Sequence, residues 1–345
     1  MAQHDTLPSP RDISALLGRL DPAYAPTPLR SLPELAKKLG IAALWVKDEG
    51  ARSLGSFKSL GGTYAGLRAL ARHVGVAPEV LLDAATRPQE LPALLCASDG
   101  NHGLAVAAAA RAAGAPCTVY LHSSVPQARA ARITAMGAAI LWVQGTYDDA
   151  VDAAVLAAEQ GDGLLVADTS LNSNDPVVGD VMAGYGVIAS EIRDQATAPF
   201  PTHLYVQAGV GGLAAAMVAG LDGFLAAPAA MAVVEPAAAA SVGAALAAGK
   251  VLRLPGALHS VAEMLSCGEA SGPALALLQP RAPRAVAVPE ERLVEAPRLL
   301  KEFGGPASTP SGATGFSGLL QDIADGRHPG AEARVVLVIS ERALA

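Results

Sequence analysis

The feature that most constrains the fold of this chain is an alternation, from about residue 41 onward, of short apolar runs with longer alanine-rich stretches. The runs have the length and β-branched content of strands, and the stretches between them are long enough for helices. The strand candidates are IAALWVKD, LPALLCAS, PCTVYLH, AAILWVQ, GLLVAD, THLYVQAG, MAVVEP, PRAVAVP and ARVVLVIS. Such an alternation is typical of βα units, and it predicts an α/β fold of two doubly wound domains with mostly parallel sheets.

The candidate strands are continuous apolar runs rather than alternating ones, which predicts that helices cover both faces of each sheet. Ligands bind such folds at the carboxyl ends of the strands. A chain of 345 residues is long enough for about two domains. We expect loops near APTPLRSLP, TSLNSNDPVVGD and KEFGGPASTPSG, which carry the Pro, Gly, Ser and Asn of turns.

Composition narrows the possible partners. The formal net charge is -7 and lysine and arginine form no run, so we expect no nucleic-acid partner. The stretch MAQHDTLPSPRD lacks the basic and apolar regions of a signal peptide, and charged residues and prolines interrupt the apolar stretches. We therefore expect a cytoplasmic protein that contacts no membrane.

The cysteines Cys96, Cys117 and Cys267 are odd in number, widely spaced and set in apolar surroundings. This pattern fits buried, reduced thiols better than a disulfide framework or a zinc site. We expect no metal site in this chain.

Lys58, in the stretch GSFKSLGG, follows one strand candidate and opens a segment of helical character, FKSLGGTYAGLRALARH. The positive end of a helix dipole disfavours an ammonium group at this position. The same effect is expected to lower the pKa of the amine and make it a usable nucleophile. A solvated surface lysine is the alternative interpretation. Because active-site groups collect in strand-to-helix turns, Lys58 is a catalytic candidate.

A second polar turn, SDGNHG, ends the strand candidate LPALLCAS. Gly100 lets the backbone approach a ligand closely. Asp99 offers a carboxylate for acid or base chemistry, and Asn101 both donates and accepts hydrogen bonds. Helix capping by Asp99 or Asn101 is the alternative, and His102 is equally well explained as a packed core residue.

A third strand candidate leads into QAGVGGLAAAMVAG, where glycines precede a helical stretch. Exposed backbone N–H groups at a helix N-terminus bind phosphate. The letters GVGGLA also resemble a dinucleotide-binding pattern, with Glu235 at the end of the next strand candidate to bind a ribose. The segment therefore predicts a phosphate site and leaves the cofactor open.

Together these three segments and VVLVIS, which ends in Ser340, resemble the fold type II family of pyridoxal-phosphate enzymes, which includes threonine dehydratases, serine racemases and diaminopropionate ammonia-lyases. The resemblance spans roughly residues 25 to 340. It implies pyridoxal 5'-phosphate as cofactor and an amino acid substrate. The sequence does not give the oligomeric state, and we expect a homodimer because that is the commonest assembly of soluble enzymes. It also implies a large cofactor-binding domain of residues 20–90 and 176–345, a small domain of residues 91–175, and an active site in the cleft between them.

The resemblance implies roles for individual residues. Lys58 would form the Schiff base with the cofactor, Asn101 would hold the phenolic oxygen, and Ser340 would face the pyridine nitrogen. The phosphate would be cradled by the glycine-rich loop of Gly209, Val210, Gly211 and Gly212.

Aspartate in SDGNHG is typical of the diaminopropionate ammonia-lyase branch, because dehydratases and racemases usually have serine or alanine there. The stretches VKDEG, YDDAV, DVMAGYG and MLSCGEAS match that branch as well. The branch implies α,β-elimination of D- or L-2,3-diaminopropionate to pyruvate and two ammonia. Lys58 and Asp99 would be bases on opposite faces of the substrate, and Asp168 an auxiliary carboxylate. That branch normally continues with Trp-Glu-Gly-Tyr, or a sequence close to it, after the residues that match Asp168 and Thr169. This chain continues with SLNSNDPVV instead, so we expect an altered substrate pocket.

Three alternatives stay open. Another fold type II β-eliminase or racemase, similar to serine and threonine dehydratases, would result if the altered segment has rebuilt the pocket. A dinucleotide-dependent oxidoreductase would use GVGGLA together with Glu235. A cofactor carrier, or a subunit that acts only with a partner protein, would keep Lys58 without turning over an amino acid.

Overall fold

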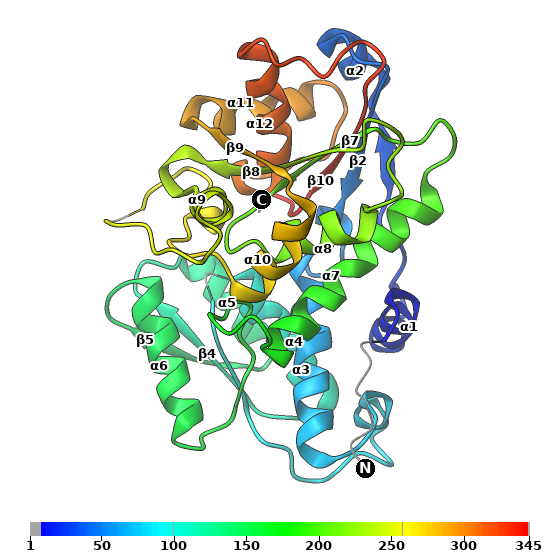
Figure 1. Cartoon of the computed structure of the whole chain (residues 1–345). Helices are drawn as coiled ribbons and strands as arrows, with labels where there is room; N and C mark the ends of the chain where they lie inside the picture. The colour runs from blue at the N-terminus through cyan, green and yellow to red at the C-terminus, as the bar shows by residue number, and fades with distance from the viewer. Residues whose placement is uncertain (1–7, 99, 257, 344–345) are drawn as a thin grey trace. The chain divides into compact units, whose positions relative to one another are not determined.

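The computed structural model describes residues 8–98, 100–256 and 258–343, and contacts divide the chain into two compact units (Figure 1). Unit 1 comprises residues 1–25, 58–168 and 175–187, and unit 2 comprises residues 26–57, 169–174 and 188–345. Each unit has its own sheet. The domain boundaries and the cleft expected from the sequence stay predictions.

Unit 1 is built on a parallel sheet with the strand order β5-β4-β3-β6. Its strands are β3 (Leu94–Ala97), β4 (Cys117–His122), β5 (Ala139–Val143) and β6 (Leu164–Leu165). Its helices are α1 (Pro10–Leu20), α3 (Lys58–Val74), α4 (Asn101–Ala113), α5 (Gln127–Ala135), α6 (Tyr147–Glu159) and the first part of α7 (Pro176–Gln195).

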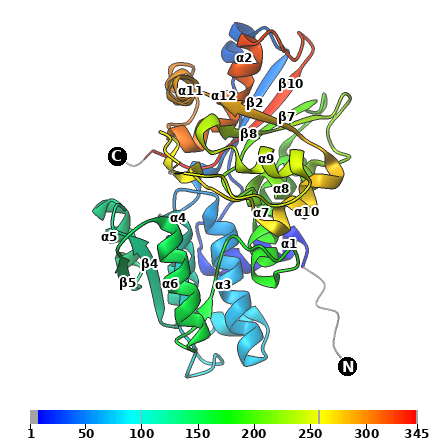
Figure 2. The ribbon, with the colours of Figure 1, turned by 60° about the vertical axis from the view of Figure 1, so that its left-hand side comes forward.

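Helices α3 and α4 lie side by side in unit 1 and are in close contact (Figure 2). A Cβ atom on Gly62 would lie 2.7 Å from the Cβ of Ala105, and one on Gly66 would lie 2.7 Å from the Cβ of Ala109. Real side chains do not pack that closely, so glycine at both positions lets the two helix backbones approach. This approach positions the first turn of α3, where Lys58 lies.

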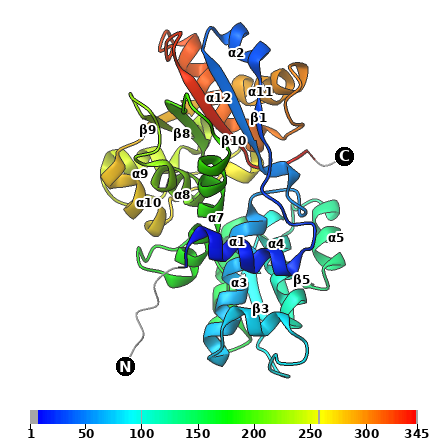
Figure 3. The ribbon, with the colours of Figure 1, turned by 90° about the vertical axis from the view of Figure 1, so that its right-hand side faces the viewer.

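Unit 2 contains a six-stranded sheet in the order β1-β2-β10-β7-β8-β9 (Figure 3). Strand β1 is antiparallel to β2 and the other pairs are parallel. The strands are β1 (Leu29–Ser31), β2 (Ala43–Asp48), β7 (His203–Gln207), β8 (Ala230–Pro236), β9 (Arg284–Val288) and β10 (Arg334–Ile339). The helices are α2 (Pro33–Leu39), the end of α7, α8 (Gly212–Leu221), α9 (Ser241–Ala248), α10 (Gly272–Leu278), α11 (Glu290–Glu302) and α12 (Pro310–Ala324).

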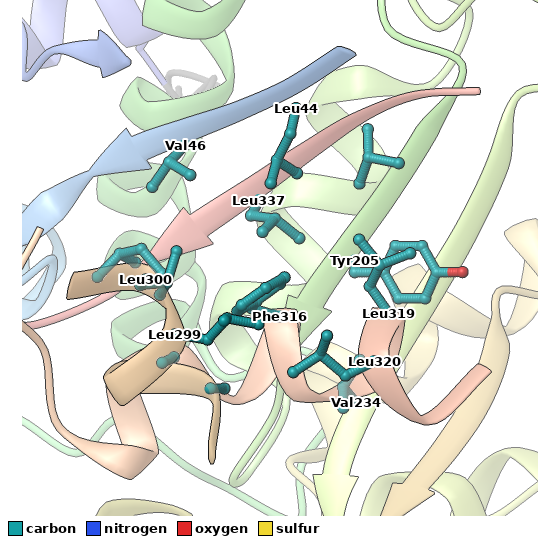
Figure 4. Packing of buried hydrophobic residues seen from close by; sticks show 14 of the residues in the cluster. Leu44, Val46, Tyr205, Val234, Leu299, Leu300, Phe316, Leu319, Leu320 and Leu337 are labelled. Atoms are coloured by element: carbon teal, nitrogen blue, oxygen red, sulfur yellow. The ribbon is translucent and has the colours of Figure 1, made fainter. Parts of the chain in front are cut away.

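The main core of unit 2 lies between its sheet and the helices α11 and α12. Phe316 of α12 is fully buried, and Leu44, Leu337 and Leu300 belong to the same cluster (Figure 4). Burying a side chain of this size contributes roughly 1.5–3 kcal/mol. This core fixes β10 and β7, whose carboxyl ends lead to two of the predicted cofactor-binding segments.

The structure confirms all nine predicted strands and the α/β class with mostly parallel sheets. Some details of the prediction are wrong. The segment TSLNSNDPVVGD, expected to be a loop, ends in the first residues of α7, which begins at Pro176. The segment APTPLRSLP, expected to be a loop, contains β1, an edge strand of only three residues. Strand β5 is not covered on both faces, because Leu141 and Trp142 are 44% and 38% exposed. In the described part of the chain, no helix has the length and apolarity needed to cross a membrane.

The cysteines have free thiols, as the sequence predicted. Cys96 and Cys117 are buried, and Cys267 is partly buried. Burial raises the pKa of the Cys117 thiol to about 12 and raises the pKa of Cys96 well above its ordinary value. Two of the three cysteines are therefore protonated core side chains at neutral pH.

A buried ionic cluster in unit 2 holds the segment that leads to Lys58. Glu191 Oε2 lies 2.6 Å from Lys47 Nζ and 2.7 Å from Arg52 Nη2, and Arg52 Nε lies 2.9 Å from Glu49 Oε2. All four side chains are at most 7% exposed. Buried charges tolerate the loss of water only when they are paired, so each member depends on the others.

We expect Glu191→Gln to destabilise the cofactor-free protein by about 3–5 kcal/mol, because Lys47 and Arg52 would share only one remaining buried carboxylate. The matched control is Glu302→Gln, whose partner Arg298 is 68% exposed, and it should cost about 0.5 kcal/mol or less. Urea unfolding measures both changes. Equal effects of the two substitutions would contradict a structural role of the cluster.

Candidate active site

The predicted site residues occur in both units. Lys58, Asn101 and Asp168 belong to unit 1, while Ser340 and the glycine-rich loop of residues 209–212 belong to unit 2. Asp99, the predicted second base, lies outside the described residues.

Lys58 and Asp168 form an ion pair in unit 1. Lys58 is the first residue of α3, as the sequence predicted, and Asp168 follows the short strand β6. The Lys58 Nζ donates to Asp168 Oδ2, and the two side chains are 20% and 12% exposed. The structure thus brings together two residues that lie 110 positions apart in the sequence.

This pairing reverses the direction of the pKa shift expected for Lys58. Burial alone would lower the pKa of the amine, but the Asp168 carboxylate and then Tyr185 more than offset it and raise the pKa above its ordinary value. Burial opposes ionisation of Asp168, yet the Lys58 ammonium holds the pKa of that carboxyl well below its usual range. The prediction of a lowered lysine pKa is therefore wrong for the cofactor-free chain, because the helix position was known and the carboxylate partner was not.

Tyr185 of α7 is a member of this cluster that the sequence reasoning missed. Its side chain is 1% exposed, and Lys58 Nζ lies 5.8 Å from the centre of its ring. Burial, the largest effect, raises the pKa of the phenol to about 12, so it is neutral at physiological pH. The stretch DVMAGYG contains this tyrosine, but an aromatic residue in an apolar helix gives no sequence signal beyond core packing.

The turn that begins α4 is organised by Ser98. Its Oγ accepts hydrogen bonds from the backbone N–H groups of Gly100 (2.9 Å) and Gly103 (2.8 Å). Gly100 is the N-cap, with φ of 145° and no side-chain cap, and Asn101 is the first helical residue. Asn101 therefore does not cap the helix, and its amide is placed at the helix start.

His102 is a buried core residue, the simpler of its two interpretations. Its Nε2 lies 2.7 Å from the carbonyl oxygen of Val166. Burial lowers the pKa of the imidazole, so it is neutral at physiological pH. This contact anchors α4 beside the chain segment that carries Asp168.

In unit 2 the glycine-rich loop leads from β7 into α8. Gly211 is the N-cap of α8, with φ of 98°, and no side chain caps this helix end. The first N–H groups of a helix have no partner within the helix and attract anions. The N–H of Ser271 donates to the carbonyl of Val210 at 2.8 Å and so fixes the backbone of the loop. The backbone groups at the start of α8 are thus suited to a phosphate.

Ser340 directly follows β10 and is 5% exposed. Its backbone N–H donates to Gly312 (3.1 Å), and its carbonyl accepts from Phe57 (2.9 Å), the residue before Lys58 in the sequence. These bonds fix the backbone of Ser340 at the carboxyl end of a central strand, where the fold places ligand contacts.

Glu235, the residue that a dinucleotide would need, is committed to the protein itself. Its Oε1 accepts from the N–H of Val242 at 2.7 Å, and its Oε2 accepts from that of Gly243 at 2.8 Å. The side chain is 1% exposed. Both carboxylate oxygens thus cap the start of α9, which argues against binding a ribose.

These observations fit pyridoxal phosphate. A largely buried amine at a helix start can bond to an aldehyde, and the uncapped N-terminus of α8 can bind a phosphate dianion. The loop is also closely packed, because a Cβ atom on Gly211 would lie 3.2 Å from both Val242 and Ala274. The fold and these residues define an α/β enzyme of the pyridoxal-phosphate class.

Comparison with known proteins agrees with this class. Residues 20–341 match the family "Pyridoxal-phosphate dependent enzyme", and the chain belongs to that family. The resemblance to pyridoxal-phosphate enzymes, the fold class and the cofactor predicted from the sequence are thereby confirmed.

Among curated proteins, the chain is 35% identical over 207 residues to a diaminopropionate ammonia-lyase of Salmonella typhimurium, covering 57% of this chain and 51% of that protein. It is 31% identical over 256 residues to the diaminopropionate ammonia-lyase of Escherichia coli K12, covering 71% of this chain and 63% of that protein. The chain thus spans between half and two thirds of the length of these relatives.

Solved structures show the same fold over the whole chain. The holo diaminopropionate ammonia lyase from Escherichia coli superposes with a TM-score of 0.84 at 26% identity, covering 99% of this chain and 90% of that one. A threonine deaminase from T.th. gives a TM-score of 0.78 at 28% identity, covering 98% of this chain and 100% of that one.

We expect Gly61→Ala to destabilise the protein by about 1–3 kcal/mol, because the new Cβ would lie 2.4 Å from Tyr185 Cε1 and 2.5 Å from the Val181 carbonyl. The matched control is Gly179→Ala in α7, where nothing lies within 4 Å and alanine should stabilise the helix by about 0.5–1 kcal/mol. Thermal or urea unfolding gives both values. Changes of the same sign would contradict the tight packing at Gly61.

Proposed function

We propose that this chain is a pyridoxal-phosphate-dependent ammonia-lyase, a carbon-nitrogen lyase that converts 2,3-diaminopropionate and water to pyruvate and two ammonia. The observation that carries the proposal is the Lys58–Asp168 pair at the start of α3, in a chain whose curated relatives include diaminopropionate ammonia-lyases. The pair supplies an amine that can exchange a proton and a carboxylate that can hold a cation.

The bound cofactor supplies an electron sink for negative charge at the α-carbon of the substrate. Lys58 would anchor the cofactor and, as a free amine, accept the α-proton at its Nζ. Because the pKa of Lys58 is raised in the cofactor-free chain, its ammonium group must first lose a proton. The neighbouring Asp168 carboxylate accepts a hydrogen bond from this amine and so orients it.

Asp168, the auxiliary carboxylate of the sequence analysis, is suited to binding amines. In the cofactor-free chain the Lys58 ammonium holds the pKa of Asp168 well below its ordinary range, so the carboxylate is ionised at neutral pH while an ammonium group lies beside it. An ionised carboxylate cannot donate a proton, but it can hold an ammonium group, either that of Lys58 or the β-ammonium of the substrate. We propose that Asp168 orients amines rather than protonating the leaving group.

The other cofactor contacts remain part of the proposal. We propose that the backbone of Gly209–Gly212 binds the phosphate, that Asn101 binds the phenolic oxygen and that Ser340 faces the ring nitrogen. Asp99 is proposed as the base for the opposite face of the substrate, which would admit the D-enantiomer. A homodimer and a cytoplasmic location likewise stay predictions.

A second candidate function is β-elimination or racemisation of a hydroxy amino acid such as serine or threonine. It is favoured by the segment after Asp168, where Leu171 is 68% exposed and no aromatic residue occurs between Thr169 and Asn174. This segment is held by its own turns: the N–H of Asn172 donates to Ser170 Oγ at 3.2 Å, and that of Asn174 to Asn172 Oδ1 at 3.1 Å.

The direct test is to supply D- and L-2,3-diaminopropionate, serine and threonine in parallel to the purified, cofactor-loaded protein and to measure ammonia and pyruvate. The proposal predicts two ammonia per pyruvate from diaminopropionate and faster turnover of it than of serine or threonine. Activity on serine or threonine with none on diaminopropionate would overturn the proposal and support the second candidate.

We expect Lys58→Ala to reduce turnover at least about a thousandfold, because the amine that anchors the cofactor and accepts the proton is lost. Lys250→Ala removes an exposed lysine and serves as the control, with turnover unchanged. Steady-state rates on the best substrate give the comparison. Retention of full activity by the Lys58 variant would remove the basis of the mechanism.

We expect Gly211→Ala to weaken cofactor binding about tenfold, because alanine at φ of 98° strains the loop that precedes α8. Gly223→Ala carries a similar strain at φ of 69° but has nothing within 4 Å, and it should leave cofactor affinity unchanged. Titration of the cofactor-free variants with pyridoxal phosphate measures this. Equal losses in both variants would argue against a phosphate site at this loop.

A further inference from the structure

The ring of Tyr185 occupies a space that exists only because two helices in unit 1 carry glycines where they approach. A Cβ on Gly61 of α3 would lie 2.4 Å from Tyr185 Cε1 and 2.8 Å from its Cζ. A Cβ on Gly184 of α7 would lie 2.6 Å from the Cα of Gly61. Small residues at both positions therefore let α7 press its tyrosine against the first turn of α3.

This packing aims the tyrosine at the reactive lysine. Lys58 lies three residues before Gly61, hence about one turn away on the same face of α3. Its Nζ lies 5.8 Å from the Tyr185 ring centre, within the range at which an aromatic ring attracts a cation. Because the ring is 1% exposed, the side of the ammonium group that faces it meets a protein side chain instead of bulk water.

We propose that Tyr185 is a positioning residue for the amine chemistry: together with Asp168 it stabilises the ammonium form of Lys58 and so sets how much of the amine is free to react. The influence on Lys58 is a property of the chain itself, and only its consequence for turnover rests on the proposed function.

The titratable groups of Asp168, His102 and Tyr185 interact electrostatically with Lys58, and they differ in charge. Asp168 is the anion, His102 is neutral because burial lowers its pKa, and Tyr185 is neutral because burial raises its pKa to about 12. His102 Nε2 is already committed to the Val166 carbonyl. Tyr185 is thus the neutral dipole whose oxygen can accept a hydrogen bond from the ammonium, and its effect on the lysine pKa is upward.

The direction of the effect follows from this arrangement. Tyr185→Phe keeps the ring that attracts the cation but removes the phenol oxygen, so the ammonium form loses a hydrogen-bond acceptor. The lysine pKa should fall by about one unit, which makes about tenfold more neutral amine available at a given pH below the pKa. Tyr185→Leu removes the ring as well and should lower the pKa further.

The test measures the amine directly in cofactor-free protein. Lys58 is labelled with fluorodinitrobenzene over a range of pH, and mass spectrometry of its peptide gives the labelling rate. We expect the pH profile of Tyr185→Phe to move about one unit lower and its rate at fixed pH to rise about tenfold. The control is Tyr64→Phe, which changes another fully buried tyrosine, on α3, and should leave the pH profile of Lys58 labelling unchanged.

An unchanged profile in folded Tyr185→Phe, or an equal change in Tyr64→Phe, would overturn the proposal. If Tyr185→Phe does not fold, wild-type chain made with 3-fluorotyrosine keeps the packing and weakens the phenol oxygen as an acceptor; faster Lys58 labelling supports the proposal, and unchanged labelling overturns it. Because no substrate is used, a shifted profile in a protein without lyase activity would contradict the proposed function alone.

Discussion

The ion pair between Lys58 and Asp168 is the interaction on which the site in unit 1 depends. An ammonium group at the first residue of a helix opposes the helix dipole, and burial adds a desolvation cost. The carboxylate offsets both effects and leaves Lys58 protonated in the cofactor-free chain. The packing of α3 against α4 and α7, through glycines and alanines, holds the amine where this compensation is possible.

Most of the fold could be predicted because parallel strands are continuous apolar runs between helical stretches. The runs identified nine strands. Of the strands in the described residues, only β1 was missed, since three residues with one apolar side chain carry no strand signal. The exposure of β5 was also missed. A run such as AILWV reads the same whether its strand is buried or lies at the edge of a sheet, because edge position is set by strand order.

The candidate site could be predicted where residues follow strand ends and could not where contacts come from distant segments. Lys58 and the loop of residues 209–212 lie at helix starts that the local pattern reveals. Tyr185 lies inside a helix, and its approach to Lys58 depends on Gly61 and Gly184, which no local pattern connects. Glu235 shows the opposite error: its position after a strand suggests a ligand, but the backbone of α9 uses both carboxylate oxygens.

Whether Lys58 is the residue that bonds to the cofactor is tested most directly by borohydride reduction of the pyridoxal-phosphate-loaded protein followed by peptide mapping. Reduction makes the link between an amine and the cofactor permanent. We expect the added mass on the peptide that contains Lys58. Label on another lysine, or a protein that binds the cofactor without any reducible link, would contradict this expectation; the other lysines are Lys37, Lys38, Lys47, Lys250 and Lys301.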